Sequence, residues 1–264
     1  MGLPCLASDW DESPTPVKKN EPAEATGSSS TNGNKFILHG QVQHSDKLPA
    51  LGQSMQAGSN FNPNSIPQAK YASSWFKIPR WFAGTFESHA STIEYMKDYV
   101  SGRASRPHET VSSFGEEMYG YQQDSHGDIW HFYVKSGSSK TEQEGHITVN
   151  NIDWYGPELV SEERVVLRIL ATSLIVDKRS GIIVDSFRRE DLKTYEPIGN
   201  GVMRVSYTSK SFDSHGLPRD LQNGVSLHRR SAPFQPINGD GRTQDYRQMF
   251  KDYLSNEGLS QLSP

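Results

Sequence analysis

Cysteine is nearly absent from the sequence, in which Cys5 is the single thiol. One cysteine cannot form an intramolecular disulfide, and it excludes zinc and iron–sulfur sites that are built from several thiolates. Long apolar runs are missing as well, because no segment approaches the roughly 20 apolar residues of a membrane-spanning helix. We therefore expect no transmembrane segment and a folded state that is stabilised by side-chain packing.

Neither sign of charge is in large excess. Lysine and arginine number 27 against 31 aspartate and glutamate residues, so the formal net charge is -4. A surface that attracts polyanions needs a clear basic excess, and we therefore expect no nucleic-acid partner. Apolar residues make up 34% of the chain and the mean hydropathy is -0.69, which indicates that part of the chain lies outside any core.

Residues 1–70 are rich in proline, serine and asparagine. They contain seven of the 15 prolines but only three aromatic residues, Trp10, Phe36 and Phe61. So few apolar groups cannot offset the conformational entropy that is lost on ordering. The composition predicts a disordered tether over residues 1–70 and a folded domain over residues 71–258.

From Tyr71 onward, segments rich in β-branched and aromatic residues alternate with turn sequences. The expected strands cover residues 82–88, 92–100, 109–114, 117–123, 129–136, 145–153, 164–176, 182–196, 202–212 and 220–230. Two of the connectors read DSHG, at 124–127 and 213–216, where aspartate initiates a turn and glycine accepts a positive φ. Strands joined this tightly are antiparallel. The pattern predicts a mostly β fold, an up-and-down meander that closes into a barrel or curls into a half-barrel.

The C-terminal segment follows a helical period. Its apolar residues at spacings of three and four are Tyr246, Met249, Phe250, Tyr253 and Leu254. They form one stripe of an amphipathic helix over about residues 242–256, and Gly258 favours a stop. We expect the stripe to pack on the outside of the sheet, with a helix that binds a partner protein as the alternative.

Motifs of known enzyme chemistry are missing. The sequence has no G-x-S-x-G, no H-E-x-x-H and no phosphate-binding P-loop, and the pair Gly199 and Gly201 lies between two expected strands, as in a turn. The nine histidines are scattered, and no nucleophile lies in a recognisable pair with a base. The sequence favours a non-enzymatic protein without catalytic residues, cofactor or metal site.

Arg168 stands out inside the apolar segment 164–176. It shares a strand face with Val166, Leu170 and Leu174, and a guanidinium among aliphatic side chains has to be paired or reach solvent. In a hollow barrel Arg168 would bind a ligand carboxylate. The alternative is an arginine at the outer face or the rim that bonds to a neighbouring glutamate.

Two further strands alternate so that one face of each would line an enclosed space. The side chains on these faces include His131 and Tyr133 on one strand and Met203 and Tyr207 on another. Together with Arg168, these four residues form the predicted ligand-binding set.

An aromatic segment precedes the first expected strand. Trp75, Phe76, Trp81 and Phe82 lead into a strand that opens with Gly-Thr-Phe at 84–86. This segment resembles the start of the calycin superfamily, the lipocalins and fatty-acid-binding proteins, with its opening helix and G-x-W strand. The next segment, EYMK at 94–97, is similar to the corresponding part of fatty-acid-binding proteins.

Several family features differ. Phe86 replaces the expected tryptophan, the lipocalin T-D-Y motif is missing, and LHRR at 227–230 stands where fatty-acid-binding proteins have Arg-x-Tyr. The resemblance implies a barrel of eight or more strands around an apolar ligand, with its first and last strands paired. It also implies that Arg229 or Arg230 covers Trp81 or Phe86 within about 6 Å of a ring centroid.

Two functions follow from these expectations. The first is non-enzymatic binding of a small apolar or amphiphilic ligand inside the barrel, which an enclosed cavity of roughly 300–1,000 Å³ would favour. The alternative is a protein-interaction module of an envelope or secreted assembly, with a solid core. The aromatic residues that would fill such a core are Trp81, Phe86, Trp130, Phe132 and Trp154.

The polar N-terminal segment also bears on location. A long Pro- and Ser-rich segment before a β-domain is common in exported proteins, so we expect an exported, periplasmic or envelope-associated protein, with the cytoplasm as the alternative. The first ten residues lack the apolar core of a signal peptide.

Overall fold

A computed structural model describes residues 43–66, 73–134, 137–239 and 244–264. One compact unit runs from His44 to Pro264. Its strands are β1 (Ser73–Ile78), β2 (Gly84–Asp98), β3 (Ala104–Ser105), β4 (Glu109–Tyr119), β5 (Gln122–Gln123), β6 (Ile129–Val134), β7 (Gly137–Gln143), β8 (His146–Val160), β9 (Val165–Asp177), β10 (Ile183–Gly199), β11 (Val202–Phe212) and β12 (Pro218–Pro233). The helix is α1 (Tyr246–Asn256), and short 3-10 turns are η1 (Gln53–Met55), η2 (Pro63–Ser65), η3 (Arg80–Phe82) and η4 (Ser260–Leu262).

The strands form two antiparallel sheets. The larger sheet has the order β3-β2-β12-β11-β10-β9-β8-β7, with β4 also paired to β2, and the smaller sheet has the order β1-β6-β5. From β7 to β12 each strand pairs with the next along the chain, which confirms the antiparallel meander. Strand β12 then returns to β2, with Arg230 opposite Phe86, so the expected pairing of the first and last segments is also confirmed.

The larger sheet is open rather than closed into a barrel. Within the described residues, β7 lies at one end of the strand order and β3 and β4 lie at the other, and no pairing joins these ends. The sheet is nevertheless rolled. Glu117 on β4 and Lys193 on β10 are separated in the sheet by β2, β12 and β11, yet Glu117 Oε1 lies 2.9 Å from Lys193 Nζ.

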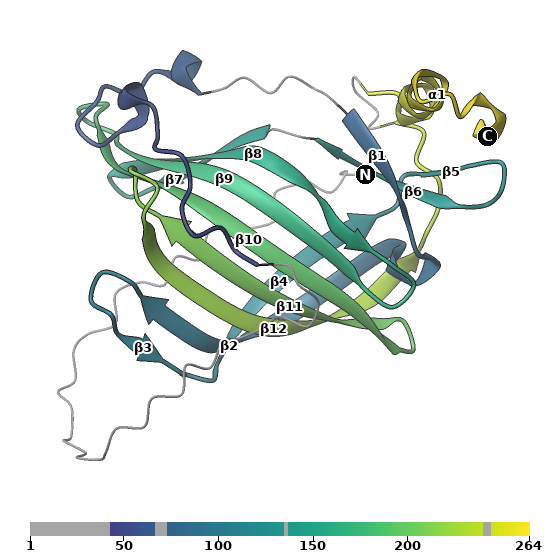
Figure 1. Ribbon diagram of the computed structural model, residues 1–264, viewed down its shortest axis with the longest axis horizontal. Helices are drawn as coiled ribbons and strands as arrows, with labels where there is room; N and C mark the ends of the chain where they lie inside the picture. Colours follow the sequence, from purple (N-terminus) through teal and green to yellow (C-terminus); the bar gives the residue numbers. More distant parts are fainter. Residues whose placement is uncertain (1–42, 67–72, 135–136, 240–243) are drawn as a thin grey trace. The chain divides into compact units, whose positions relative to one another are not determined.

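This roll defines two faces. The face that carries Glu117 and Lys193 is the inner face, and the opposite one is the outer face. Strand β4 passes behind β10 and β11 in Figure 1. Across the roll the hydroxyl of Tyr119 lies 2.9 Å from that of Tyr195, so the inner face meets itself at this end of the sheet.

Aromatic and aliphatic side chains fill the same end of the inner face, in a cluster that we call the plug. Its buried members are Ile78, Phe82, Ala83, Phe86, Tyr119, Ile129, Val165, Leu167, Tyr195, Met203 and Val205. The rings of Phe82 and Tyr119 are stacked with centroids 4.1 Å apart. The guanidinium of Arg230 lies 5.2 Å from the ring centroid of Phe86, which confirms the expected cation–π contact.

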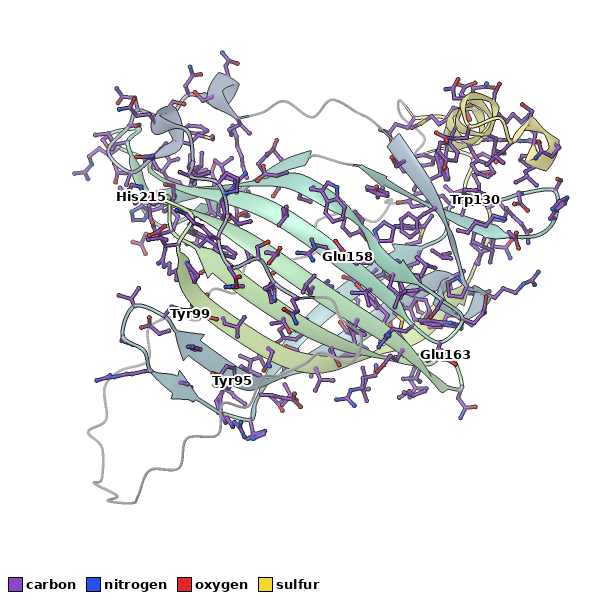
Figure 2. The ribbon with its side chains drawn as sticks, in the orientation of Figure 1. Tyr95, Tyr99, Trp130, Glu158, Glu163 and His215 are labelled. Carbon is purple, nitrogen blue, oxygen red and sulfur yellow. The ribbon has the colours of Figure 1, made fainter. Side chains whose placement is uncertain are left out.

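The smaller sheet lies between the plug and α1. Its β1 and β6 contribute Ile78 and Ile129 to the plug, while their other face packs against the helix. The aromatic residues on that face are Trp75, Trp130 and Phe132, and they pack with the buried Tyr246, Phe250 and Leu254 of α1. Trp130 lies beside α1 in Figure 2. The stripe is therefore confirmed, and the surface that it covers is the smaller sheet rather than the meander.

The ends of α1 follow the expected local chemistry. The side chain of Asp245 accepts a hydrogen bond from the backbone N–H of Gln248 at the N-terminus. After the last turn, Gly258 adopts a φ of 71°, and Leu259 N donates to Leu254 O at 2.7 Å. This is a Schellman motif, which confirms Gly258 as the stop. Among the helices that the structure describes, none has the length and apolar character needed to cross a bilayer.

Expected strands merge in two places, and three strands that were not expected, β1, β3 and β7, form in the described part of the chain. Segment 109–114 joins the first residues of 117–123 in β4. The segments 82–88 and 92–100 belong to the single long strand β2, whose register shifts between Ser88 and Ala90. The aromatic segment that resembles an opening helix instead contains strand β1, followed by the turn η3. Cross-strand pairing with β6 explains the strand, because Trp75 lies opposite Phe132 and Phe76 opposite His131.

The segment from His44 to Leu51, which we call the strap, lies against the outer face. Leu48 N donates to Gly216 O at 3.1 Å and Leu51 N donates to Ser214 O at 2.8 Å. Both leucines are buried, and the strap crosses β10 in Figure 1. The tether boundary at residue 70 was therefore placed too far along the chain, because backbone hydrogen bonds and two leucines hold a segment that has few aromatic residues. Residues 1–42 lie outside the described part of the chain.

Gly216 provides a test of how the strap is held. Its φ is +81°, and a Cβ at this position would lie 1.8 Å from Leu48 O, whereas Gly145, at a φ of +80°, has no atom within 4 Å of such a Cβ. We expect Gly145→Ala to lower the free energy of unfolding by about 1–2 kcal/mol, the cost of a left-handed L-residue. Gly216→Ala should cost more and should accelerate tryptic cleavage after Lys47. Denaturant unfolding and timed digestion measure both effects, and equal behaviour of the two variants would contradict the close contact.

Candidate functional site

Arg168 lies on the outer face, apart from the other predicted ligand-binding residues. Its Nε lies 2.6 Å from Glu158 Oε1, and its Nη1 bonds to Glu190. Glu158 is labelled over the middle of the larger sheet in Figure 2. Arg168 is therefore paired with glutamate on the outer face, which was the alternative to an arginine that binds a ligand carboxylate.

Glu190 also fixes the strap to the sheet. Its carboxylate lies 2.8 Å from His44 Nδ1 and accepts hydrogen bonds from Ser45 N at 2.7 Å and Ser45 Oγ at 2.9 Å. Burial alone would raise the pKa of Glu190, but the bonds from His44 and Ser45 outweigh it and hold the pKa at about 2. The outer face therefore carries an ionised carboxylate that is bonded to groups of the strap and to Arg168.

The other four predicted residues face inward. Met203 is buried in the plug, and Tyr207 lies opposite Lys193 on the inner face. His131 and Tyr133 belong to β6 of the smaller sheet, with ring centroids 5.6 Å from those of Tyr119 and Tyr155 respectively. Of these four, Tyr207 alone extends the inner face of the larger sheet beyond the plug.

His131 has a structural role. Its Nδ1 accepts a hydrogen bond from Gly120 N at 3.1 Å, and burial lowers the pKa of the imidazole to about 3. The ring is therefore neutral at physiological pH. It is held between Phe76 and Tyr121, at centroid distances of 5.3 Å and 5.5 Å.

A polar cluster that was not predicted from the sequence lies beside the plug. Glu117 bonds to Lys193 across the roll and also accepts a hydrogen bond from Tyr119, whose hydroxyl bonds in turn to Tyr195. His228 Nδ1 lies 3.8 Å from Glu117 Oε2, and its Nε2 lies 3.0 Å from Ser226 Oγ. We call Glu117, Lys193, Tyr119, Tyr195 and His228 the inner polar cluster.

The charges of this cluster are fixed near neutral pH. Burial would raise the pKa of Glu117, but the charge and hydrogen bond of Lys193 together with His228 and the hydrogen bond from Tyr119 outweigh it and hold the pKa at about 2. Burial raises the pKa of Tyr119 and Tyr195 well above the usual value, and it lowers the pKa of His228 to about 4 despite the nearby carboxylate. Glu117 is thus an anion, Lys193 is its cation, and His228 is neutral.

Beyond the cluster, the inner face continues as rows of side chains that lie opposite one another across the strands. The first row, beside the cluster, contains Leu167, Lys193, Tyr207, Gly224 and Ile93. The second row contains Tyr155, Ile169, Asp191, Ser209, Gln222 and Met96. The third row contains Ile152, Ala171, Arg189, Ser211, Asp220 and Asp98. Arg189 Nε lies 3.1 Å from Asp191 Oδ2. Several of these side chains, including Tyr207, Ser209 and Gln222, are half-buried, so the inner face mixes aliphatic groups, hydroxyls, amides and paired charges.

A separate pocket of about 230 Å³ lies at the rim of the plug, lined by Trp81, Phe86, Pro197, Gly199, Asn200, Gly201, Val202 and Arg230. Two of its polar side chains bond to the backbone of the fold. Trp81 Nε1 donates to Glu162 O at 2.7 Å, and Arg230 Nη2 donates to Trp81 O at 2.6 Å. Among the described residues, no group of three or more His, Cys, Asp or Glu side chains is arranged to hold a metal ion.

Comparisons of the chain with family models, curated proteins and solved structures find no match. The resemblance to the calycin superfamily therefore stays a prediction that is carried by the residues of this chain.

The pairing of Glu117 with Lys193 can be tested by substitution. We expect Lys193→Met to lower the free energy of unfolding by about 3–5 kcal/mol, because it leaves a largely buried carboxylate without its cation. Glu117→Gln combined with Lys193→Met should recover most of that loss. As a control, Lys178→Met removes the cation of the more exposed pair with Glu142 and should cost less than about 1 kcal/mol. Denaturant unfolding measures these variants together with Glu117→Gln alone, and additive effects of the two inner substitutions would contradict the pairing.

The buried histidines predict sensitivity to acid. Because His228 is neutral in the folded protein down to a pKa of about 4, the unfolded chain binds more protons between pH 6.5 and 4, and stability falls as the pH is lowered through this range. His228→Gln should reduce that slope by up to about 1.4 kcal/mol per pH unit. His215→Gln, at an exposed turn position, should leave it unchanged. Unfolding curves measured from pH 7 to 4 provide the comparison, and parallel behaviour of His228→Gln and the unsubstituted protein would refute this account.

Proposed function

We propose that the protein is a non-enzymatic binder of a small amphiphilic ligand, held on the inner face of the rolled sheet as in a lipocalin-like half-barrel. The observation that carries this proposal is the composition of the inner face beyond the plug. The three rows place aliphatic side chains such as Ile152 and Ile93 on the same face as Ser209, Gln222 and the hydroxyl of Tyr207. All five are half-buried, so the face supplies both apolar contact and hydrogen-bonding groups to a ligand.

The plug favours an amphiphilic ligand over a purely apolar one. The most apolar part of the inner face is occupied by the protein's own rings, with Phe82, Phe86 and Tyr195 almost fully buried. A ligand would contact the following rows instead, where every row contains polar side chains. Such a surface matches a molecule that has both a hydrocarbon part and a polar head.

The pKa values of the inner polar cluster favour binding over acid–base catalysis. Efficient proton transfer needs a group whose pKa lies near the working pH. Glu117 with a pKa of about 2 and His228 with a pKa of about 4 are weak bases, and the hydroxyls of Tyr119 and Tyr195 are weaker acids than an exposed tyrosine. Each group is suited to structure and recognition.

A protein-interaction module is the second candidate. Phe86, Trp130 and Phe132 are buried, as a solid core requires, although Trp81 and Trp154 are only half-buried. Strand β4 pairs with β2 alone among the described strands, and its Phe114 is 62% exposed. An open edge of this kind can accept a further strand. This candidate would gain support if no amphiphile binds.

Two serines on β11 provide a matched test of the binding site. Ser209 lies on the inner face opposite Asp191 and Gln222, whereas Ser206 lies on the outer face opposite Thr194 and Val225. Ser209→Phe should cover the inner face beside Tyr207 and weaken binding of a dansyl-labelled fatty amide at least tenfold. Ser206→Phe adds the same ring to the other face and should leave binding within about twofold.

Fluorescence titration of the two variants and the unsubstituted protein measures these affinities, and native mass spectrometry of the purified protein would detect a ligand that co-purifies. If the unsubstituted protein does not bind the probe, or if both variants bind it equally well, the inner face is not the binding site.

A further inference from the structure

We infer that the inner face selects ligands whose polar head is uncharged, such as an alcohol or a glycerol ester, over carboxylates of the same chain length. The inference rests on the proposed function, because it concerns the head group of a ligand held on the inner face. It specifies the ligand class by the charge of the head group.

Each cation in the three rows of the inner face already has an anion beside it. Lys193 Nζ lies 2.9 Å from Glu117 Oε1, and Arg189 Nε lies 3.1 Å from Asp191 Oδ2. The side chains of Lys193 and Asp191 are only 16% and 8% exposed, so water screens these pairs poorly. A carboxylate that approached either cation would meet the anion that the cation already neutralises.

The cations outside these rows do not alter this balance. Arg168 is on the outer face, between Glu158 and Glu190. Lys210 is also on the outer face, where it lies opposite Glu190 and donates to Ser45 O at 2.7 Å. At the end of the sheet farthest from the plug, Arg219 bonds to Asp185 at 2.9 Å and lies 4.0 Å from Asp220. Arg230, at the plug end of the inner face, is held by the ring of Phe86 at 5.2 Å and by Trp81 O at 2.6 Å. A charged head placed in the three rows would therefore lose its hydration and meet only cations that already have an anion beside them.

An uncharged head has suitable partners in the same rows. The side chains of Ser209 and Gln222 lie opposite each other in the second row, and Tyr207 lies in the row beside the cluster. Hydroxyl and amide groups both donate and accept hydrogen bonds, which matches an alcohol or an ester. The aliphatic Ile93, Ile169 and Ile152 of the same three rows would contact the hydrocarbon part.

The first measurement compares two probes on the unsubstituted protein at pH 7.5, namely 1-decanoylglycerol and decanoate, by titration calorimetry below their critical micelle concentrations. We expect 1-decanoylglycerol to bind at least tenfold more tightly. Equal binding, or tighter binding of decanoate, would overturn the charge selectivity while leaving the proposed binding function intact. Binding of neither probe would count against the proposed function itself.

The second measurement changes the charge balance of the site. Glu117→Gln keeps the shape of the side chain but leaves Lys193 without its carboxylate, so decanoate should gain at least tenfold in affinity while 1-decanoylglycerol changes less than threefold. Glu116→Gln removes the same charge from the adjacent, exposed position on β4 and should alter neither affinity. A gain for decanoate in both variants would assign the effect to net charge alone and contradict the inference.

Asp191→Asn provides an independent test, because it releases Arg189 in the same way and does not depend on the folding of Glu117→Gln. Thermal melting of each variant establishes that it is folded at the temperature of the titration. If folded Glu117→Gln and folded Asp191→Asn both retain the selectivity of the unsubstituted protein, the paired charges do not set it and the inference fails.

Discussion

The ion pair between Glu117 and Lys193 is the contact on which the arrangement of the larger sheet depends. The two residues come from β4 and β10, which do not pair, so the contact forms only when the intervening β2, β12 and β11 are strongly curved. Each charge is largely removed from water and is stable there because the other is present. The pair thus fixes how far the sheet rolls. The roll in turn brings Tyr119 against Tyr195 and completes the plug.

The sequence predicted the local structure well because local structure depends on near neighbours. Segments rich in β-branched and aromatic residues marked β9 and β11, and the DSHG connectors form turns in which Gly127 and Gly216 adopt positive φ, as expected. The inner polar cluster could not be found in this way, since its strands are far apart in the chain. One signal does exist: Glu117 and Lys193 each stand two residues before a buried tyrosine, which places charge and ring on the same strand face.

Arg168 shows where sequence reasoning stops. Its apolar surroundings indicated that it had to be paired, and the β9–β10 hairpin brings Glu190 to the diagonal position beside it, opposite Leu170. The choice between an inner and an outer face could not be made, because β9 has buried side chains on both faces, Leu167 toward the plug and Val166 on the other side. The strap that covers the outer face is held largely by backbone bonds, which leave little trace in residue types.

Strand β10 carries compensated charge on both faces, with Glu190 bonded on the outer face and Lys193 on the inner one. The two carboxylates concerned, Glu190 and Glu117, both have a pKa of about 2, below their ordinary value of 4.5. The stability they contribute is complete above pH 4.5 and is lost as the pH falls toward 2, because the unfolded chain then binds more protons. The contacts that hold the strap and the ion pair that holds the roll therefore weaken over the same pH range. A single strand thus couples the segment that covers one face to the curvature that shapes the other.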